Sequence, residues 1–367
     1  MAKHHDDDED ALRLEDLAGD DSDSYRADSA PAGRRKNFFG RHKVLTAFLV
    51  LLGLLVGSVV GFAVYLNSKL SDVDTYVSKI DEKDRVPKVD VPAGQKAPIN
   101  ILLLGADKAS GKSIAELIAA GKWAPGSMRS DTMMLVHIPA DRSRVYLMSF
   151  PRDSWVNIPG RQGKDKINAA FSYGGPDLAL KTIEQYSQVH IDHVMMIDWN
   201  GFKDLTDALG GVTINEPGVG THKMNGEQAL AYVRTRYTLP NGDFDRVKRQ
   251  QNFLRAIMAQ TVDSISVTDP LMLSGVLGAV ANNTTVDADF TPSVMRDLAW
   301  EMRGIKTQNV SFFTVPTKGT GMEGAASVVY LDDARCKELF TAVNNGLLPQ
   351  YMNSHKVDSL PDPSNVN

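Results

Sequence analysis

One segment of the sequence is long and apolar enough to cross a lipid bilayer. Residues 44–66 are rich in Leu, Val, Phe, Ala and Gly and contain no charged side chain. A transmembrane helix needs about 20 apolar residues to cross a hydrocarbon core of about 30 Å. We therefore expect a transmembrane helix at residues 44–66. The chain has no comparable second segment, so we expect a single span.

The charges on either side of this segment predict its orientation. Lys69, Asp72 and Asp74 follow it, whereas five basic residues precede it: Arg34, Arg35, Lys36, Arg41 and Lys43. Cytoplasmic flanks carry an excess of Lys and Arg, so the N-terminus is expected in the cytoplasm and the C-terminal domain outside. The long acidic N-terminal region has no small-residue cleavage site after Leu66, which favours an uncleaved, single-pass signal anchor in the cell membrane.

Glycines within the predicted transmembrane helix leave its oligomeric state open. Gly53, Gly57 and Gly61 recur at four-residue spacing, which allows two helices to approach closely. A homodimer through this helix is therefore possible, although small residues are common in membrane spans.

Composition divides the rest of the chain into a tail, a stalk and one globular domain. Residues 1–43 are predicted to be a disordered acidic cytoplasmic tail with a basic end beside the membrane. Residues 67–98 are predicted to form an extracytoplasmic stalk, 99–350 one globular domain and 351–367 a loose C-terminal tail. The formal net charge of -5 gives no argument for nucleic acid, and the single Cys336 excludes internal disulfides.

The order of expected elements predicts an α/β fold. Strands are expected at 101–104, 132–138 and 144–150, and a turn at 139–143 joins the last two as a hairpin. Helices are expected at 177–187, 200–209, from Asn225, at 244–260 and at 332–344, with strands near 193–197, 211–214 and 310–315. Because strands and helices alternate irregularly, we expect a mixed β-sheet sandwiched between helices.

A first candidate site lies at the ends of the first three strands. If the first strand runs antiparallel to the second, four charged residues meet at one edge of the sheet: Asp107, Arg129, Asp131 and Arg152. Two carboxylates and two guanidinium groups are unfavourable in a core but suit a divalent cation and a phosphate group. Taken singly, Asp107 and Asp131 could instead finish or cap a turn.

A second candidate site follows in residues 231–251. Arg234 and Arg236 are two positions apart on extended chain, and Arg246 and Gln250 are one turn apart on the next helix. Val247, Leu254 and Met258 would form the buried side of that helix. The four polar side chains could converge on an anion, and the alternative is a solvated basic surface.

Residues 106–113 match the consensus of a phosphate-binding P-loop only in part. The segment ends in Gly-Lys-Ser between a strand and a helical stretch, but Ala106 replaces the first glycine. An extracytoplasmic location also separates the segment from ATP. We therefore do not expect an ATPase.

The motifs, in their order along the chain, resemble the LytR-CpsA-Psr (LCP) family. They are ILLLGAD, RSDTMML, SFPRDS, KINAA, YVRTRY and GDFDRVKRQQ, from about residue 99 to about residue 253. The resemblance implies an LCP-like α-β-α domain that acts as a phosphotransferase. It would move a glycopolymer from a polyprenyl-pyrophosphate carrier to peptidoglycan, form a phosphodiester and release polyprenyl phosphate.

The same resemblance implies roles for the candidate residues. Asp107 and Asp131 would hold Mg²⁺ or Mn²⁺, and the catalytic set would be Asp107, Asp131, Arg152, Arg234 and Arg236. The pyrophosphate would be bound by Arg129, Arg152, Arg234, Arg236, Arg246 and Gln250. Lys108 and Ser154 depart from the residues usual in the family, and neither is a predicted ligand.

Several questions stay open at the level of sequence. The same site could act as a lipid-pyrophosphate hydrolase, or the domain could be a non-catalytic envelope sensor. Asp131 is a hypothesis for the general base, although a metal-bound carboxylate is a weak base. The pattern of apolar residues does not distinguish a tunnel for the lipid tail from an ordinary core.

Overall fold

The computed structural model describes residues 68, 73–107, 112–126, 128–236, 238–261, 278 and 280–367. The predicted cytoplasmic tail, the predicted transmembrane helix and its glycines lie outside these residues. Within them, no helix combines the length and the hydropathy that crossing a bilayer requires. The membrane anchor and its dimerisation therefore stay predictions.

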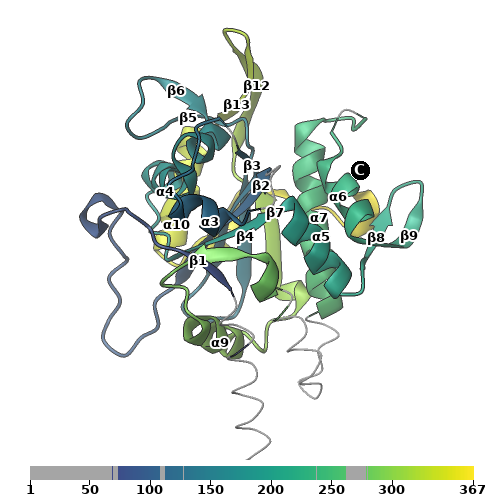
Figure 1. The fold of residues 1–367 in the computed structure, drawn as a ribbon, viewed down its shortest axis with the longest axis horizontal. Coiled ribbons are helices and arrows are strands. Elements are labelled where there is room, and N and C mark those ends of the chain that lie inside the picture. Colours follow the sequence, from purple (N-terminus) through teal and green to yellow (C-terminus); the bar gives the residue numbers. More distant parts are fainter. Residues whose placement is uncertain are drawn as a thin grey trace, which may run out of the picture. The chain divides into compact units, whose positions relative to one another are not determined.

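A mixed eight-stranded sheet forms the centre of the described domain (Figure 1). Three neighbouring pairs, β1 with β10, β2 with β7 and β4 with β11, are parallel, and the others are antiparallel. The strands follow the order β1 (Asp74–Tyr76), β10 (Thr285–Asp287), β7 (His193–Asp198), β2 (Ile99–Asp107), β3 (Arg129–Ile138), β4 (Val145–Phe150), β11 (Val310–Thr314) and β14 (Asp358–Ser359). The predicted mixed sheet is confirmed.

Helices cover both faces of this sheet (Figure 1). Alternate residues of β3 point to opposite sides, so Met133 and Leu135 join one hydrophobic cluster while Met134 and Val136 join another. The first cluster packs against α4 (Ile167–Ser187) and α10 (Asp333–Asn344), with α3 (Ile114–Ala119) and α11 (Leu348–Ser354) beside them. The second packs against α7 (Asp243–Thr261) and α9 (Pro292–Glu301). The sandwich predicted from the sequence is therefore present.

A third cluster lies on the side of α7 that faces away from the sheet. Phe253 of α7 packs there against α5 (Trp199–Ala208), α6 (Gly226–Arg234) and the hairpin of β8 (Val212–Glu216) and β9 (Gly220–Met224). Gln251 faces the sheet instead, where its side-chain amide donates to Ser149 Oγ at 2.8 Å. Helix α7 is thus packed on two sides.

Smaller elements complete the described chain. Two further hairpins pair β5 (Trp155–Asn157) with β6 (Lys164–Lys166) and β12 (Thr317–Glu323) with β13 (Ala326–Leu331). Three short 3-10 turns are η1 (Glu82–Asp84), η2 (Thr307–Asn309) and η3 (Pro363–Asn365). The helix predicted at 177–187 is the C-terminal part of α4, which continues across a kink at Gly174–Gly175–Pro176.

Both segments predicted to lie outside the globular domain contribute to it. Within the predicted stalk, β1 pairs with β10, and Arg85 Nη2 forms a 2.7 Å ion pair with Glu184 Oε1 of α4. Within the predicted loose tail, β14 pairs with β11 and Val366 is fully buried. Polar, proline-containing sequence concealed these contacts, because short paired strands, single buried residues and ion pairs carry them.

We expect Glu184→Ala to lower the free energy of unfolding by about 3 kcal/mol, because removing one partner leaves the other charge unpaired in a buried site. Its carboxylate is 1% exposed and accepts from Arg85 and from the Ile191 amide. Urea denaturation measures the change. Glu227→Ala is the control, because Glu227 pairs with Lys203 on the surface and should leave stability unchanged. Equal effects of both variants would refute this role of Glu184.

We expect the buried imidazole of His137 to lower the free energy of unfolding in acid. Burial first, and then the Arg142 charge, lower the pKa of its imidazole to about 4, and Nδ1 lies 2.8 Å from Asn100 Oδ1. The unfolded chain therefore binds a proton at a higher pH than the folded chain. We expect stability to fall between pH 6.5 and 4, by about 2 kcal/mol at pH 5 relative to pH 7. His137→Gln should remove this part of the pH dependence, and an unchanged slope in that variant would contradict the assignment.

Candidate functional site

A β-bulge shapes the sheet edge where the first candidate residues lie. Gly105 pairs with Thr132 and Ala106 pairs with Ser130, so Asp131 is an extra residue on β3. A Cβ added to Gly105 would lie 2.9 Å from Thr132 Cβ, which explains the glycine. Bulges change the direction of side chains at the end of a ladder. Strands β2 and β3 pair antiparallel, which is the condition on which the first candidate site depended.

Two arginines converge on Asp131. Arg152, which follows β4, places Nη1 2.6 Å from Asp131 Oδ1, and Arg246 of α7 places Nη1 3.6 Å from Asp131 Oδ2. The structure therefore joins the first candidate site to the second. Arg246 is 3% exposed, so its charge is held inside the protein.

Asp243 is a second carboxylate between the same arginines, and the sequence analysis missed it. Its Oδ1 lies 2.8 Å from Arg246 Nη2, 3.4 Å from Arg152 Nε and 3.9 Å from Arg236 Nε. Asp243 and Arg246 are three residues apart in the first turn of α7, a spacing that puts them on one face. This three-residue spacing was the signal in the sequence that could have identified Asp243 as a partner of Arg246.

Asp107 lies at the end of β2 with different partners. Its Oδ1 accepts a hydrogen bond from Trp199 Nε1 at 2.6 Å, and the Arg234 guanidinium lies 5.1 Å from the centre of the Trp199 ring. Trp199, the first residue of α5, is a second residue that the sequence analysis missed. It connects Asp107 to the end of α6.

Arg234 and Arg236 do not act as a pair on extended chain. Asn225 caps α6 as predicted and forms a capping box with Gln228, but the helix continues through Arg234. Arg234 therefore contacts Trp199 while Arg236 approaches Asp243. Because the extended chain starts only at Thr235, the two arginines are not both on extended chain as expected.

The remaining predicted ligands border this arrangement. Arg129 is exposed and stands opposite Asp107 in the β2–β3 ladder. Gln250 follows Arg246 by one turn of α7 and is buried. The predicted buried side of α7 is confirmed, because Val247 is buried and Leu254 and Met258 pack toward the sheet.

The segment at the start of α4 supports Arg152 through the backbone. The amide of Asn168 donates to the Arg152 carbonyl at 3.2 Å, and the amide of Ile167 donates to the Ser154 carbonyl at 2.8 Å. Lys166 forms a 2.9 Å ion pair with Asp153. The Lys-Ile-Asn motif therefore fixes the chain on both sides of Asp153.

The charges of this site are only partly balanced. Burial lowers the pKa of Arg246, whereas the carboxylates of Asp131 and Asp243 outweigh burial at Arg152 and raise its pKa. Among the described residues, Arg246 Nε is buried and forms no hydrogen bond, and Arg246 Nη2 and Arg152 Nε face Asp243 Oδ1 in ion pairs of 2.8 and 3.4 Å that lack hydrogen-bond geometry. Buried donors normally have partners, so these groups can bind the oxygens of an anion.

The carboxylates fit a magnesium ion that shares its coordination with phosphate. Mg²⁺ typically takes one or two protein carboxylates together with phosphate oxygens and water. Asp107 at the end of β2 and Asp131 at the bulge are two such groups on neighbouring strands. The described residues contain no group of three or more His, Cys, Asp or Glu arranged around a metal position.

The P-loop-like segment has another structural role where it is described. Ala106 and Asp107 complete β2, and Ser113 forms a capping box with Glu116 at the start of α3. Residues 108–111 lie outside the described part of the chain. The Ser113 hydroxyl accepts from the Glu116 amide at 3.1 Å, as a helix cap does.

Comparisons with known proteins agree with the family resemblance of the motifs. The model of the LytR_cpsA_psr family matches residues 61–345. An Enterococcus faecalis protein named polyisoprenyl-teichoic acid–peptidoglycan teichoic acid transferase TagU is 31% identical, over 71% of this chain and 80% of the relative. A Corynebacterium glutamicum relative named probable cell wall biosynthesis protein LcpB is 34% identical, over 72% of this chain and 65% of the relative.

A solved structure shares the fold. The crystal structure of Bacillus subtilis TagV superposes with a TM-score of 0.57 and 24% sequence identity, over 69% of this chain and 98% of that one. The mixed sheet and its helical layers are therefore those of a known architecture.

The ion pairs predict how an Asp243→Ala variant responds to an anion. We expect the substitution to lower the free energy of unfolding by roughly 3 kcal/mol, because Arg246 loses a partner inside the protein. Inorganic pyrophosphate should raise the thermal midpoint of the variant more than that of the wild type, because it replaces the lost charge without repulsion from Asp243. Asp297→Ala is the control, because Asp297 lies on the surface beside Arg296. Equal rises in all three proteins would contradict an anion site here.

Proposed function

Because this chain belongs to the LytR-CpsA-Psr family, we propose that it transfers a glycopolymer from a polyprenyl-pyrophosphate carrier to peptidoglycan. Relatives named as teichoic acid transferases support this enzyme class. The observation that carries the proposal is the convergence of Arg152 and Arg246 on Asp131 and Asp243, with buried donors left for an anion.

The arginines would bind the pyrophosphate of the donor. Arg152 and Arg246 would act from inside the site, because they are the most enclosed of its cations. Their planar guanidinium groups suit phosphate oxygens. Arg129, Arg234, Arg236 and Gln250 would complete the binding set from the ends of β3, α6 and α7. Phosphate would then replace Asp131 as the partner of Arg152.

Asp107 and Asp131 would hold Mg²⁺, with Mn²⁺ as the alternative. The ion, when bound, would neutralise charge that develops on the oxygens of the transferred phosphate. Trp199 would keep Asp107 directed toward the site through its indole hydrogen bond. If Arg152 moved from Asp131 to the phosphate, the Asp131 carboxylate would be free to bind the metal.

The reaction would be an in-line displacement at the sugar-linked phosphorus. A hydroxyl oxygen of the peptidoglycan sugar forms the new P–O bond, and the bond to the bridging oxygen breaks, so polyprenyl phosphate leaves. Arg152 and Arg246 would stabilise the charge on the departing and non-bridging oxygens. Asp131 remains our candidate to accept the hydroxyl proton.

We place this reaction at the outer face of the cell membrane. The apolar segment at residues 44–66 would anchor the domain beside its lipid-linked donor. Partly buried methionines on the α7 side of the sheet, among them Met195, Met258 and Met295, offer adaptable apolar surface for the lipid tail.

A reconstituted reaction tests this proposal. Full-length protein, Mg²⁺, a polyprenyl-pyrophosphate oligosaccharide and peptidoglycan fragments should give the phosphodiester-linked product by mass spectrometry. We expect Asp107→Ala and Arg246→Ala each to lower the rate by about 100-fold, because each removes charge stabilisation at the phosphate. The matched controls are Asp297→Ala and Arg296→Ala, which change an aspartate and an arginine on the surface of α9.

The reaction product distinguishes a transferase from a hydrolase and from a non-catalytic sensor. Free sugar phosphate would indicate a hydrolase, and binding without turnover would indicate a sensor. Normal rates in both site variants would refute the residue assignment. A near-normal rate of Asp131→Asn would exclude Asp131 as the general base.

A further inference from the structure

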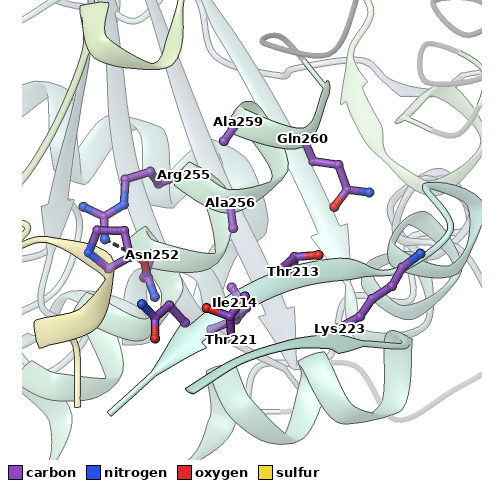
Figure 2. Close-up of a pocket in the computed structure, with 11 residues that line it drawn as sticks. Thr213, Ile214, Thr221, Lys223, Asn252, Arg255, Ala256, Ala259 and Gln260 are labelled. Carbon is purple, nitrogen blue, oxygen red and sulfur yellow. Dashed lines mark hydrogen bonds between the residues drawn. The ribbon is translucent and has the colours of Figure 1, made fainter. Parts of the chain in front are cut away.

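A cavity of about 480 Å³ lies on the side of α7 that faces away from the sheet (Figure 2). The β8–β9 hairpin forms one wall, residues of the C-terminal half of α7 form another, and Pro363 of η3 closes one end. The volume lies within the usual range of small-molecule sites, about 300–1,000 Å³.

This cavity is separate from the arginine cluster, formed by Arg152, Arg236 and Arg246 around Asp243. Arg255, which lines it, lies about 13 Å further along the axis of α7 than Arg246. The cluster occupies the N-terminal end of the helix, whereas Asn252, Arg255, Ala256 and Ala259 form a stripe toward the hairpin. A ligand here would therefore not displace one at Asp131.

The charge of the lining is positive. Lys223 of β9 and Arg255 of α7 both line the cavity, and none of the described lining residues carries a carboxylate. Figure 2 shows the Lys223 side chain at the opposite end of the cavity from Arg255. Two cations without an anionic neighbour in the lining favour an anionic ligand.

Arg255 is held in place through two of its three guanidinium nitrogens. Its Nη2 donates to Asn252 Oδ1 and its Nη1 to the Pro361 carbonyl, each at 2.6 Å. Its Nε is buried and has no hydrogen-bond acceptor among the described residues. Burial lowers the pKa of this guanidinium, and the Asp362 charge opposes that effect. An arginine fixed in this way presents a positive charge with little loss of side-chain entropy on binding.

The other lining residues suit a sugar ring. Ala256 and Ala259, which are partly buried, provide a small apolar surface, and Thr213, Thr221 and Asn215 provide hydroxyl and amide groups around it. A saccharide has an apolar ring face and a rim of hydroxyl groups, so it can use both kinds of surface. Few convergent polar groups around an apolar wall are typical of ligand sites.

We propose that this cavity is a subsite for an acidic sugar unit, phosphorylated or carboxylated, of a glycan that the enzyme handles. The identity of that glycan as a substrate rests on the proposed function, whereas the binding itself does not. Occupation of this subsite would hold the glycan at a second point beside α7 while the arginine cluster holds the pyrophosphate.

Equilibrium binding to the full-length protein in detergent micelles tests the subsite. The probes are three short oligosaccharides of equal length: a phosphodiester-linked one, a uronic acid oligomer and a neutral glucan. We expect at least one acidic probe to bind in a salt-dependent manner and the neutral glucan to bind about tenfold more weakly or not at all. Binding of the phosphodiester probe alone would identify the donor polymer as the source, and the carboxylated probe alone would identify the acceptor glycan.

Two variants and a control locate the binding. Lys223→Glu reverses one charge of the lining, and Ala259→Leu fills part of the cavity without changing charge. Each should weaken binding of the acidic probe by about tenfold, while Lys337→Glu, an exposed change on α10, should not. Thermal unfolding checks that all three variants fold. Tenfold weakening by both cavity variants is the expected result.

Equal binding of the neutral glucan, or wild-type affinity in either cavity variant, would overturn the subsite. The wild-type transfer reaction distinguishes this failure from failure of the proposed function. If the wild-type protein transfers the glycan but the cavity variants bind the acidic probe with wild-type affinity, the subsite alone is rejected. Binding that depends on the cavity, in a protein without transfer activity, rejects the proposed function alone.

Discussion

Ion pairs that link two partly buried aspartates, Asp131 and Asp243, to the partly buried Arg152 and the buried Arg246 are the interaction on which this structure depends. Charges inside a protein are tolerated only when they are paired, and breaking such a pair is strongly destabilising. These pairs connect the bulge of β3, the end of β4 and the first turn of α7. The network therefore joins the sheet to its covering helix while leaving buried donors for a ligand.

Helix α7 connects the parts of the molecule because each of its sides has a different role. Its N-terminal turn carries Asp243 and Arg246, and Leu254 and Met258 pack toward the sheet. Phe253 packs in the third cluster, and Arg255 faces the cavity under the β8–β9 hairpin. One amphipathic helix thus places the ion pairs of Asp243 and Arg246, an apolar layer and the cavity beside the β8–β9 hairpin in a fixed relation.

The sequence predicted the central strands because their patterns are local and strong. The β3–β4 hairpin, its pairing with β2 and the capped helix α6 all follow from short motifs. The partners of Asp107 and Arg152 did not follow, because Trp199 and Asp243 reach them from distant elements. Strands β1 and β14 were missed for a related reason: each is short and stabilised by pairing at a sheet edge rather than by its own hydrophobic pattern.

A structure of the full-length protein with a polyprenyl-pyrophosphate analogue and Mg²⁺ tests the central claim most directly. The account predicts pyrophosphate oxygens within hydrogen-bonding distance of Arg152 and Arg246, with Arg152 released from Asp131 and the metal between Asp107 and Asp131. Pyrophosphate bound elsewhere, with the 2.6 Å pair of Arg152 and Asp131 intact, would contradict it.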